Sequence, residues 1–340
     1  MPPTESQFIG CLLGQCLGDA LGFPVEGYPP DACQAYVKTL PFGSIPFGRP
    51  GFVAGQYTDD SQLARELIES IVEQGFFQPV DYANRIARIF AEGRVVGRGI
   101  ATEKAARRLR AGVPWHQAGA PPPAAGNGAA MRAAPIGLFF YDDPDALVIA
   151  AVDQGRITHQ DPRACGGAVA IAGAVALAME GVVEPSEFLG RLSRWVERVD
   201  PRMASAVRNL EEWLWLPPDE AVVHIAHFGS DGQDEGWPGI SPYVIGSVVW
   251  ALYSFLCSPK HYWLTLCTAI SVGGDVDTTA AMAGAISGAY LGEEALPEEG
   301  VRQLGDQGLW QEEELRHLAR QLFDLATQRS AHQQSYRRAL

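Results

Sequence analysis

Two short segments of the sequence combine glycine with a cluster of oxygen-bearing side chains. Each stands directly before a stretch with the hydrophobic periodicity of a helix. Carboxylate and hydroxyl oxygens favour Mg²⁺, Mn²⁺ or Ca²⁺ over zinc, which prefers histidine and cysteine. The candidate metal ligands are Thr58, Asp59 and Asp60 in the first segment and Asp275, Asp277 and Thr278 in the second.

Helix capping is the simpler explanation of both segments. Aspartate and threonine are good N-caps, and acidic residues favour the positive end of a helix. Capping needs one such residue or two, whereas the first segment has three in a row and the second reads Asp-x-Asp-Thr. Four carboxylates brought together without a cation would have sharply raised pKa values. We therefore expect one shared site for a divalent metal.

Three other segments contain candidates of lower weight. Asn127 and Gly128 lie in the stretch GNGAAMR, which either lets the backbone approach a phosphate at a helix start or merely leads into a helix. His159 follows an apolar stretch, where histidine is more often a hydrogen-bonded structural residue. Glu26 ends the segment GDALGFPVE in a loop, where a carboxylate costs little. Only its neighbours make it a candidate.

The composition excludes several classes of partner. The formal net charge of −14, from 40 acidic and 26 basic residues, repels nucleic-acid phosphate and anionic lipid. We expect neither bulk nucleic-acid binding nor a membrane, and we interpret the apolar runs 164–181 and 279–291 as buried helices. The start of the chain has no basic stretch typical of a signal peptide. The six cysteines form no CxxC pair, which favours reduced, buried thiols and a cytoplasmic location.

Helical periodicity recurs along the chain, and few segments alternate with period two. The sequence predicts an all-α fold, a single compact multi-helix domain over 1–328, with a polar C-terminal tail at 329–340 that frays. Glycines four apart near the N-terminus predict the close approach of a second helix, and 29–57 is expected to be a long loop. Helices are expected at 6–22, 61–74, 81–92, 100–111, from near 129, and at about 145–155, 162–180, 186–197, 202–213, 241–257, 261–271, 278–291 and 311–328.

These segments together resemble the ADP-ribosylglycohydrolase family, the ADP-ribosyl-acceptor hydrolases. The matching pieces are GCLLGQCLGDALG, GQYTDDSQLA, GNGAAMRAAPIGL, ITHQDPRA and SVGGDVDTTAAMAGAISGAYLG, of which the last is the most specific. The resemblance runs from about Phe8 to Tyr290. It implies an all-α fold with a dinuclear centre of two Mg²⁺, or Mn²⁺, at the bottom of an ADP-ribose cleft. The ligands would be the two clusters named above.

The resemblance also implies roles for the remaining candidates. Glu26 and Asp60 are expected to take part in catalysis, the loop of Asn127 and Gly128 to face the phosphates or ribose, and His159 to lie near the ribose at the scissile bond. Serine-directed relatives place an aromatic residue where this chain has Ala125. Tyr243 matches an aromatic that other members use for adenine, so it is expected either to stack on adenine or simply to pack between helices. Arginine-directed relatives carry an aspartate in the loop that here reads Val-Gly-Arg-Gly-Ile over 96–100, without an acid.

The function implied is Mg²⁺-dependent hydrolysis of the glycosidic bond between ADP-ribose and an acceptor, with release of ADP-ribose. The partner would be an ADP-ribosylated protein, modified at a serine or arginine side chain, or a small molecule that contains ADP-ribose. Two alternatives stay open. The chain could be a non-catalytic ADP-ribose reader or a crystallin-like structural member of the same fold. It could also hydrolyse another ribosyl-linked nucleic acid or metabolite.

Overall fold

Helices make up nearly all of the regular structure. The computed structural model describes residues 2–230, 232 and 236–339, and within them it has isolated β-bridges but no strand. The α-helices are α1 (Glu5–Gly22), α2 (Pro30–Thr39), α3 (Asp59–Gln74), α4 (Pro79–Ala91), α5 (Ile100–Arg110), α6 (Trp115–Ala118), α7 (Ala134–Phe139), α8 (Pro144–Arg156), α9 (Pro162–Glu180), α10 (Pro185–Glu197), α11 (Pro201–Trp213), α12 (Pro218–Ala226), α13 (Val244–Cys257), α14 (Tyr262–Ile270), α15 (Val276–Leu291), α16 (Glu298–Gln303) and α17 (Glu312–Ala339). Short 3-10 turns are η1 (Phe23–Val25), η2 (Asn127–Ala129) and η3 (Glu293–Ala295).

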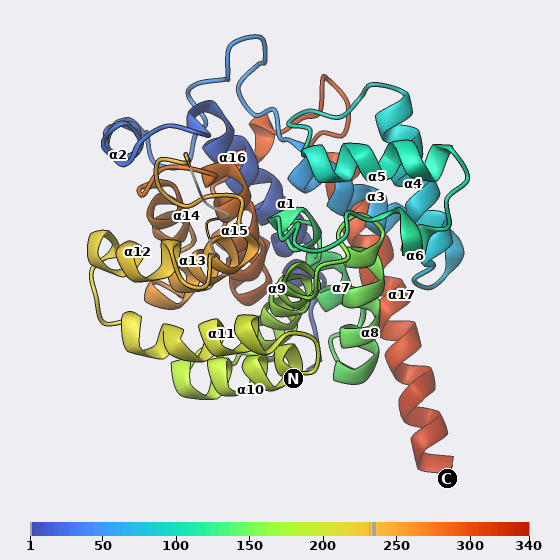
Figure 1. Ribbon diagram of the computed structural model, residues 1–340. Helices are drawn as coiled ribbons and strands as arrows, with labels where there is room; N and C mark the ends of the chain where they lie inside the picture. The colour runs from blue at the N-terminus through green and yellow to red at the C-terminus, as the bar shows by residue number, and fades with distance from the viewer. Residues whose placement is uncertain (1, 231, 233–235, 340) are drawn as a thin grey trace.

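Helices α1 and α15 lie side by side in the middle of the molecule (Figure 1). Glycine allows them to approach closely, because a Cβ on Gly14 would lie 2.5 Å from the Gly284 carbonyl oxygen. A Cβ on Gly18 would lie only 2.1 Å from the Ala280 oxygen. Overpacking of this kind typically destabilises a core by about 1–3 kcal/mol. The close approach expected from the glycine spacing is therefore confirmed, and it places the C-terminal end of α1 beside the first turn of α15.

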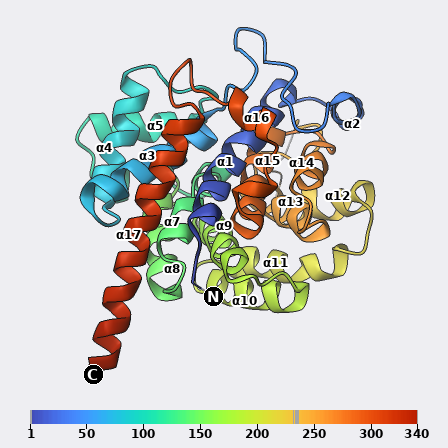
Figure 2. The ribbon, with the colours of Figure 1, turned by 180° about the vertical axis from the view of Figure 1, so that it is seen from behind.

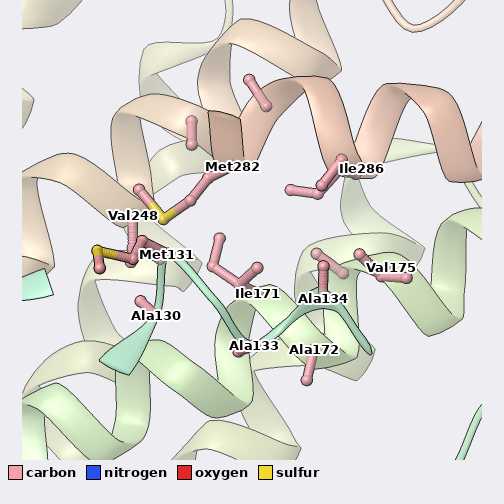
Figure 3. Packing of buried hydrophobic residues seen from close by; sticks show 14 of the residues in the cluster. Ala130, Met131, Ala133, Ala134, Ile171, Ala172, Val175, Val248, Met282 and Ile286 are labelled. Carbon is pink, nitrogen blue, oxygen red and sulfur yellow. The ribbon is translucent and has the colours of Figure 1, made fainter. Parts of the chain in front are cut away.

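The core continues from α15 into α9 and α13. The glycine loop, residues 126–128, is followed by a segment that contributes Met131 and Ala134 to this core. These two residues pack with Ile171 of α9, Val248 of α13 and Met282 of α15 (Figure 3). On the other side of α1, the long helix α17 runs beside α3 and α7 (Figure 2). The two segments with metal-ligand spacing thus begin helices on either side of α1, and both are anchored on one continuous core.

Within the part of the chain that the structure describes, two helices are long and apolar enough to cross a membrane by composition alone, those that span Glu5–Val25 and Pro162–Glu180. Within this fold, 94% and 89% of their apolar windows are buried against other helices. Their apolar character is accounted for by packing in the core. The interpretation of the runs 164–181 and 279–291 as buried helices is confirmed by α9 and α15.

The structure corrects the expectation of a loop over 29–57, and it extends the last helix beyond its expected end at 328. Helix α2 forms at Pro30–Thr39, with proline in its first turn and Cys33 as its only buried residue, so it is short and few apolar residues mark it as a helix. Helix α17 continues to Ala339, and Arg329 donates to the Phe139 carbonyl oxygen. The short helices α12 and α16 were also not expected. Of the cysteines, all free, Cys257 is exposed rather than buried.

Candidate active site

A cleft of about 550 Å³ opens above the first turns of α3 and α15. The glycine loop and the segment before α5 form its other walls. Many of the site residues that the sequence predicted line this cleft. They are Glu26, Asp59, Asp60, Asn127, Gly128, His159, Asp275, Asp277 and Thr278. Residues that line it without having been singled out include Gly97, Arg98, Gly99, Ile100, Thr102, Met131, Trp237 and Pro242.

The two metal-ligand segments meet at Asp60. The Thr58 hydroxyl oxygen lies 2.9 Å from Asp60 Oδ2, and the Thr278 hydroxyl donates to the same oxygen at 3.4 Å. The other carboxylate oxygen, Asp60 Oδ1, is buried and has no hydrogen-bond partner among the described residues. A buried carboxylate oxygen without a partner is costly unless a cation compensates it. The geometry therefore fits a metal ligand.

The capping explanation fails at both helix starts. Thr58 is the N-cap of α3 and Asp275 is the N-cap of α15, yet neither side chain makes a capping hydrogen bond. The Thr58 hydroxyl instead lies against Asp60, and the Asp275 carboxylate accepts a hydrogen bond from Asn127. These side chains are turned toward each other across the site, as ligands of a common ion would be.

Asp19 is a component of the site that the sequence reasoning missed. It is fully buried near the end of α1, where its Oδ1 accepts from both the backbone N–H and the hydroxyl of Thr58 at 2.9 Å. Its Oδ2 accepts from the Ser61 hydroxyl at 2.7 Å. The available signal was an aspartate within an otherwise apolar helical run, since a buried acid always needs partners.

The carboxylates are grouped so that they share Asp277. One group of ligand atoms, from Asp19, Asp60 and Asp277, lies within 4.8 Å of one another, and so does a second from Glu26, Asp275 and Asp277. The hydrogen bonds already accepted by Asp19 leave it better suited to hold Thr58 than to bind an ion. Carboxylates grouped in this way could hold metal.

Burial dominates the electrostatics of this cluster. Desolvation, and then neighbouring carboxylates, raise the pKa values of Asp59, Asp60 and Asp277 well above the usual range. Desolvation raises the pKa of Asp275 to about 6 and that of Asp19 to about 7, although hydrogen bonds oppose the shift at both. A divalent cation removes this penalty by favouring the ionised form of each carboxylate. The donor set of carboxylates and hydroxyls fits Mg²⁺ or Mn²⁺.

Glu26 reaches the cluster from the loop after η1. Its carboxylate forms an ion pair with Arg49, whose guanidinium lies 5.1 Å from the centre of the Phe23 ring and donates to the Phe23 carbonyl oxygen. Glu26 is partly exposed, in contrast to the buried aspartates below it. Among the described residues, Glu26 is thus the one acid of the cluster that forms an ion pair with an arginine at the solvent-exposed side of the site.

The glycine loop is joined to the carboxylates and to the histidine. The Asn127 amide donates to Asp275 Oδ2 at 2.6 Å. A Cβ on Gly128 would lie 2.7 Å from His159 Cε1, so the histidine ring occupies the space that a side chain would need. Burial, followed by the charge of Arg132, lowers the pKa of His159 to about 3. His159 is therefore neutral.

Tyr243 lies beside the cleft and does not line it. Its ring is 2% exposed, its hydroxyl donates to the Gly229 carbonyl oxygen, and the Arg163 guanidinium lies 5.8 Å from its centre. The faces of this ring are covered by protein. Trp237, which precedes α13 and is half-buried, does line the cleft and is the aromatic side chain available there among the described residues.

A family model for ADP-ribosylglycohydrolase matches residues 1–332. The chain belongs to this family. The ADP-ribosylhydrolase ARH3 of Gallus gallus is 31% identical and aligns over 87% of this chain and 88% of its own. The ADP-ribosylarginine hydrolase Tri1 of Pseudomonas putida is 29% identical, over 94% and 78%. A solved structure described as an ADP-ribosylglycohydrolase-related protein complex has a TM-score of 0.72 and 30% identity, and covers 95% of this chain and 98% of its own.

Membership of the ADP-ribosylglycohydrolase family confirms two of the expectations drawn from sequence. The all-helical fold is that of the family, and the enzyme class is a glycohydrolase of ADP-ribose linkages. The name of Tri1 specifies ADP-ribosylarginine as its substrate, whereas the name of ARH3 specifies no acceptor. The acceptor therefore has to be argued from the residues of this cleft.

Proposed function

We propose that this ADP-ribosylglycohydrolase releases ADP-ribose from serine-linked protein modifications in a reaction that depends on two Mg²⁺ ions. The observation that carries the proposal is the pair of carboxylate groups that share Asp277 at the floor of the cleft. The buried Asp60 oxygen without a protein partner supports the same assignment. The proposed ligands are Thr58, Asp59, Asp60, Asp275, Asp277 and Thr278.

The ions, when bound, supply Lewis acidity toward the ribose hydroxyls and a water. The protein residues then carry out three tasks. Asp60 or Glu26 takes a proton from the attacking water as the water oxygen bonds to the anomeric carbon. The bond between the anomeric carbon and the acceptor oxygen breaks, and the proton taken from water is passed on to that oxygen, which leaves as an alcohol. The surrounding carboxylates stabilise the positive charge that develops on the sugar ring in the transition state. The loop of Asn127 and Gly128, together with His159, orients the ribose and phosphates.

The adenine needs an aromatic plane, since stacking contributes roughly 1–3 kcal/mol per base. Tyr243 was the candidate from sequence, but protein atoms cover its ring. We infer instead that Trp237 provides this plane, because its side chain lines the cleft, as the glycine loop and Pro242 also do.

Arg98 supports a serine linkage over an arginine linkage. It is exposed on the segment before α5, lines the cleft, and is the only lysine or arginine among the described lining residues. An arginine acceptor would bring a second guanidinium toward this rim, where the segment 96–100 offers no acid to pair with it. A serine acceptor carries no charge. Like charges at close range disfavour binding, so the serine linkage is the better match.

A panel of defined substrates tests the proposal. Peptides that carry ADP-ribose on serine or arginine, and ADP-ribosylated DNA, are incubated with the enzyme and Mg²⁺, and the products are measured by mass spectrometry. We expect ADP-ribose release from the serine peptide. Preference for the arginine peptide would reject the role of Arg98, and release only from DNA would favour the nucleic-acid alternative.

The non-catalytic alternatives predict different outcomes. A crystallin-like structural protein would show no thermal shift with Mg²⁺ or ADP-ribose. A reader of ADP-ribose would show the shift and leave every modified substrate intact. Clustered buried carboxylates with raised pKa values destabilise a fold, which is the physical argument against a purely structural role.

A further inference from the structure

Beneath the cleft, a buried arginine is connected to His159 through a threonine hydroxyl. Arg132 Nη2 donates to Thr158 Oγ1 at 2.8 Å, and Thr158 Oγ1 lies 2.8 Å from His159 Nδ1. Both Arg132 and Thr158 are completely buried. A buried guanidinium is costly, so its position calls for an explanation beyond the packing of the core.

The direction of these hydrogen bonds follows from what each group can do. A guanidinium only donates, so the Thr158 oxygen accepts from Arg132, and the hydroxyl hydrogen needs an acceptor of its own. Among the described residues, His159 Nδ1 is the remaining partner of that hydroxyl. If Nδ1 carried a hydrogen, the Thr158 hydrogen would be buried without an acceptor, at about 1–3 kcal/mol. Nδ1 is therefore the acceptor, and the ring hydrogen resides on Nε2.

The surrounding charges keep the ring neutral. Arg132 is fixed by Gln154, which accepts from its Nε at 3.0 Å, and it opposes a second positive charge on His159. Asp161 faces the ring but is paired with Arg163 through a 2.8 Å contact. The Cys165 thiol donates to the His159 carbonyl oxygen and leaves the ring unaffected.

His159 lines the ligand cleft, together with Gly126 and Gly128. Nε2 lies 3.5 Å from the position of a Cβ on Gly126, and it has no hydrogen-bond partner among the described residues. We propose that Arg132 and Thr158 are positioning residues that fix His159 as the Nε2–H tautomer, so that it donates a hydrogen bond to an oxygen of the bound ADP-ribose. Only the identity of that ligand rests on the proposed function. In this arrangement, His159 cannot act as the general base.

The tautomer is measured directly on the ligand-free protein. In ¹⁵N-labelled enzyme, with the His159 signal assigned by its loss in His159→Gln, we expect a protonated Nε2 and an unprotonated Nδ1 throughout pH 5.5–8. A protonated Nδ1, or a ring that becomes doubly protonated in this range, would overturn the inference. The spectrum does not depend on catalysis, so a protein with the expected tautomer that binds no ADP-ribose would reject the proposed function alone.

Two substitutions separate positioning from packing. Thr158→Val keeps the shape of the side chain but removes the hydroxyl, whereas Thr158→Ser keeps the hydroxyl and removes a methyl group. We expect Thr158→Val to show a mixture of tautomers and about tenfold weaker ADP-ribose binding, which is about 1.4 kcal/mol. Thr158→Ser should restore both properties. An unchanged His159 spectrum in Thr158→Val, or equal losses in both variants, would contradict a role through the hydroxyl.

Discussion

Asp19 lies directly behind Thr58 and accepts hydrogen bonds at 2.9 Å from both its backbone N–H and its hydroxyl. This contact ties the end of α1 to the first turn of α3. Because the glycines of α1 hold that same end against α15, Asp19 fixes the distance between the two ligand segments. The geometry of the site depends on an acid that need not touch a metal.

Replacement of Asp19 by asparagine should therefore damage the site without abolishing the fold. An amide nitrogen cannot accept, so at least one buried donor of Thr58 or Ser61 loses its partner, at about 1–3 kcal/mol of stability. We expect Mg²⁺ affinity and ADP-ribose release to fall by about tenfold or more. The measurements are calorimetric Mg²⁺ titration and a hydrolysis assay.

The matched control is Asp31→Asn, at an exposed position of α2. It removes one negative charge at a similar place in the chain and should change neither property. A wild-type Mg²⁺ affinity in Asp19→Asn would show that Thr58 does not need this anchor.

Glu26→Ala should lower hydrolysis by at least about a hundredfold, or about 2.7 kcal/mol, while ADP-ribose binding stays measurable. The reason is that Glu26 reaches the shared carboxylate cluster from the solvent side, where water enters. Arg49→Ala removes the ion pair but keeps the carboxylate, and its loss should stay below about tenfold. Turnover assays on both variants decide the matter: full activity of Glu26→Ala would reject its catalytic role.

Trp237→Ala should weaken ADP-ribose binding by about tenfold, or about 1.4 kcal/mol, if this ring supports the adenine. Tyr243→Phe removes only the hydroxyl that donates to Gly229 and should bind almost normally. Mg²⁺ affinity in the absence of nucleotide should be unchanged in both. Calorimetry with ADP-ribose and with free ribose phosphate separates the adenine contribution. Normal ADP-ribose affinity in Trp237→Ala would place the adenine elsewhere.

The raised carboxylate pKa values predict a stabilisation by Mg²⁺ that grows with pH. Without metal, the pKa of Asp275 is about 6 and that of Asp19 about 7, against about 3.9 for an unfolded aspartate. Between these values the folded state binds more protons than the unfolded state, so stability present below about pH 4 is lost as pH rises toward 7. Mg²⁺ binds the ionised carboxylates and offsets this loss. The increase in Tm with saturating Mg²⁺ should be larger at pH 8 than at pH 5.5.

The control for this linkage is Asp277→Ala, because Asp277 belongs to both carboxylate groups. Its Tm should respond weakly to Mg²⁺ at either pH. Equal increases at both pH values in the wild type would mean that the ion binds outside this cluster.

Most helices around the site could be predicted because each has apolar residues at helical spacing or forms a long apolar run. Helices α9 and α15 are buried along almost their whole length, so their sequences are apolar all round and show a continuous apolar run in place of a one-sided period. Helix α2 could not be predicted, since it buries only Cys33 and its start is defined by prolines. The continuation of α17 was missed because polar residues obscure the few contacts, such as that of Arg329, that hold it to the body.

The site itself was only partly visible in the sequence. Two clusters of acids at helix starts could be related by their shared chemistry, although 218 positions separate Asp60 from Thr278. Which side chains face a cleft is set by tertiary packing, so Tyr243 and Trp237 could not be ranked from sequence. Asp19 carries no signal of its role beyond its polarity within an apolar helix, because its partners lie 39 and 42 positions away.

The central claim is that the shared carboxylate cluster drives metal-dependent release of ADP-ribose. The most direct test uses a peptide with serine-linked ADP-ribose and enzyme stripped of metal with EDTA, with ADP-ribose release followed as Mg²⁺ is restored. We predict that the wild-type enzyme releases no ADP-ribose before Mg²⁺ is added and releases it fully afterwards. Rates should be at least about a hundredfold lower in Asp59→Ala, Asp60→Ala, Asp275→Ala and Asp277→Ala. All four variants should remain folded. Release by the metal-free enzyme, or near wild-type rates in any two of these variants, would contradict the account.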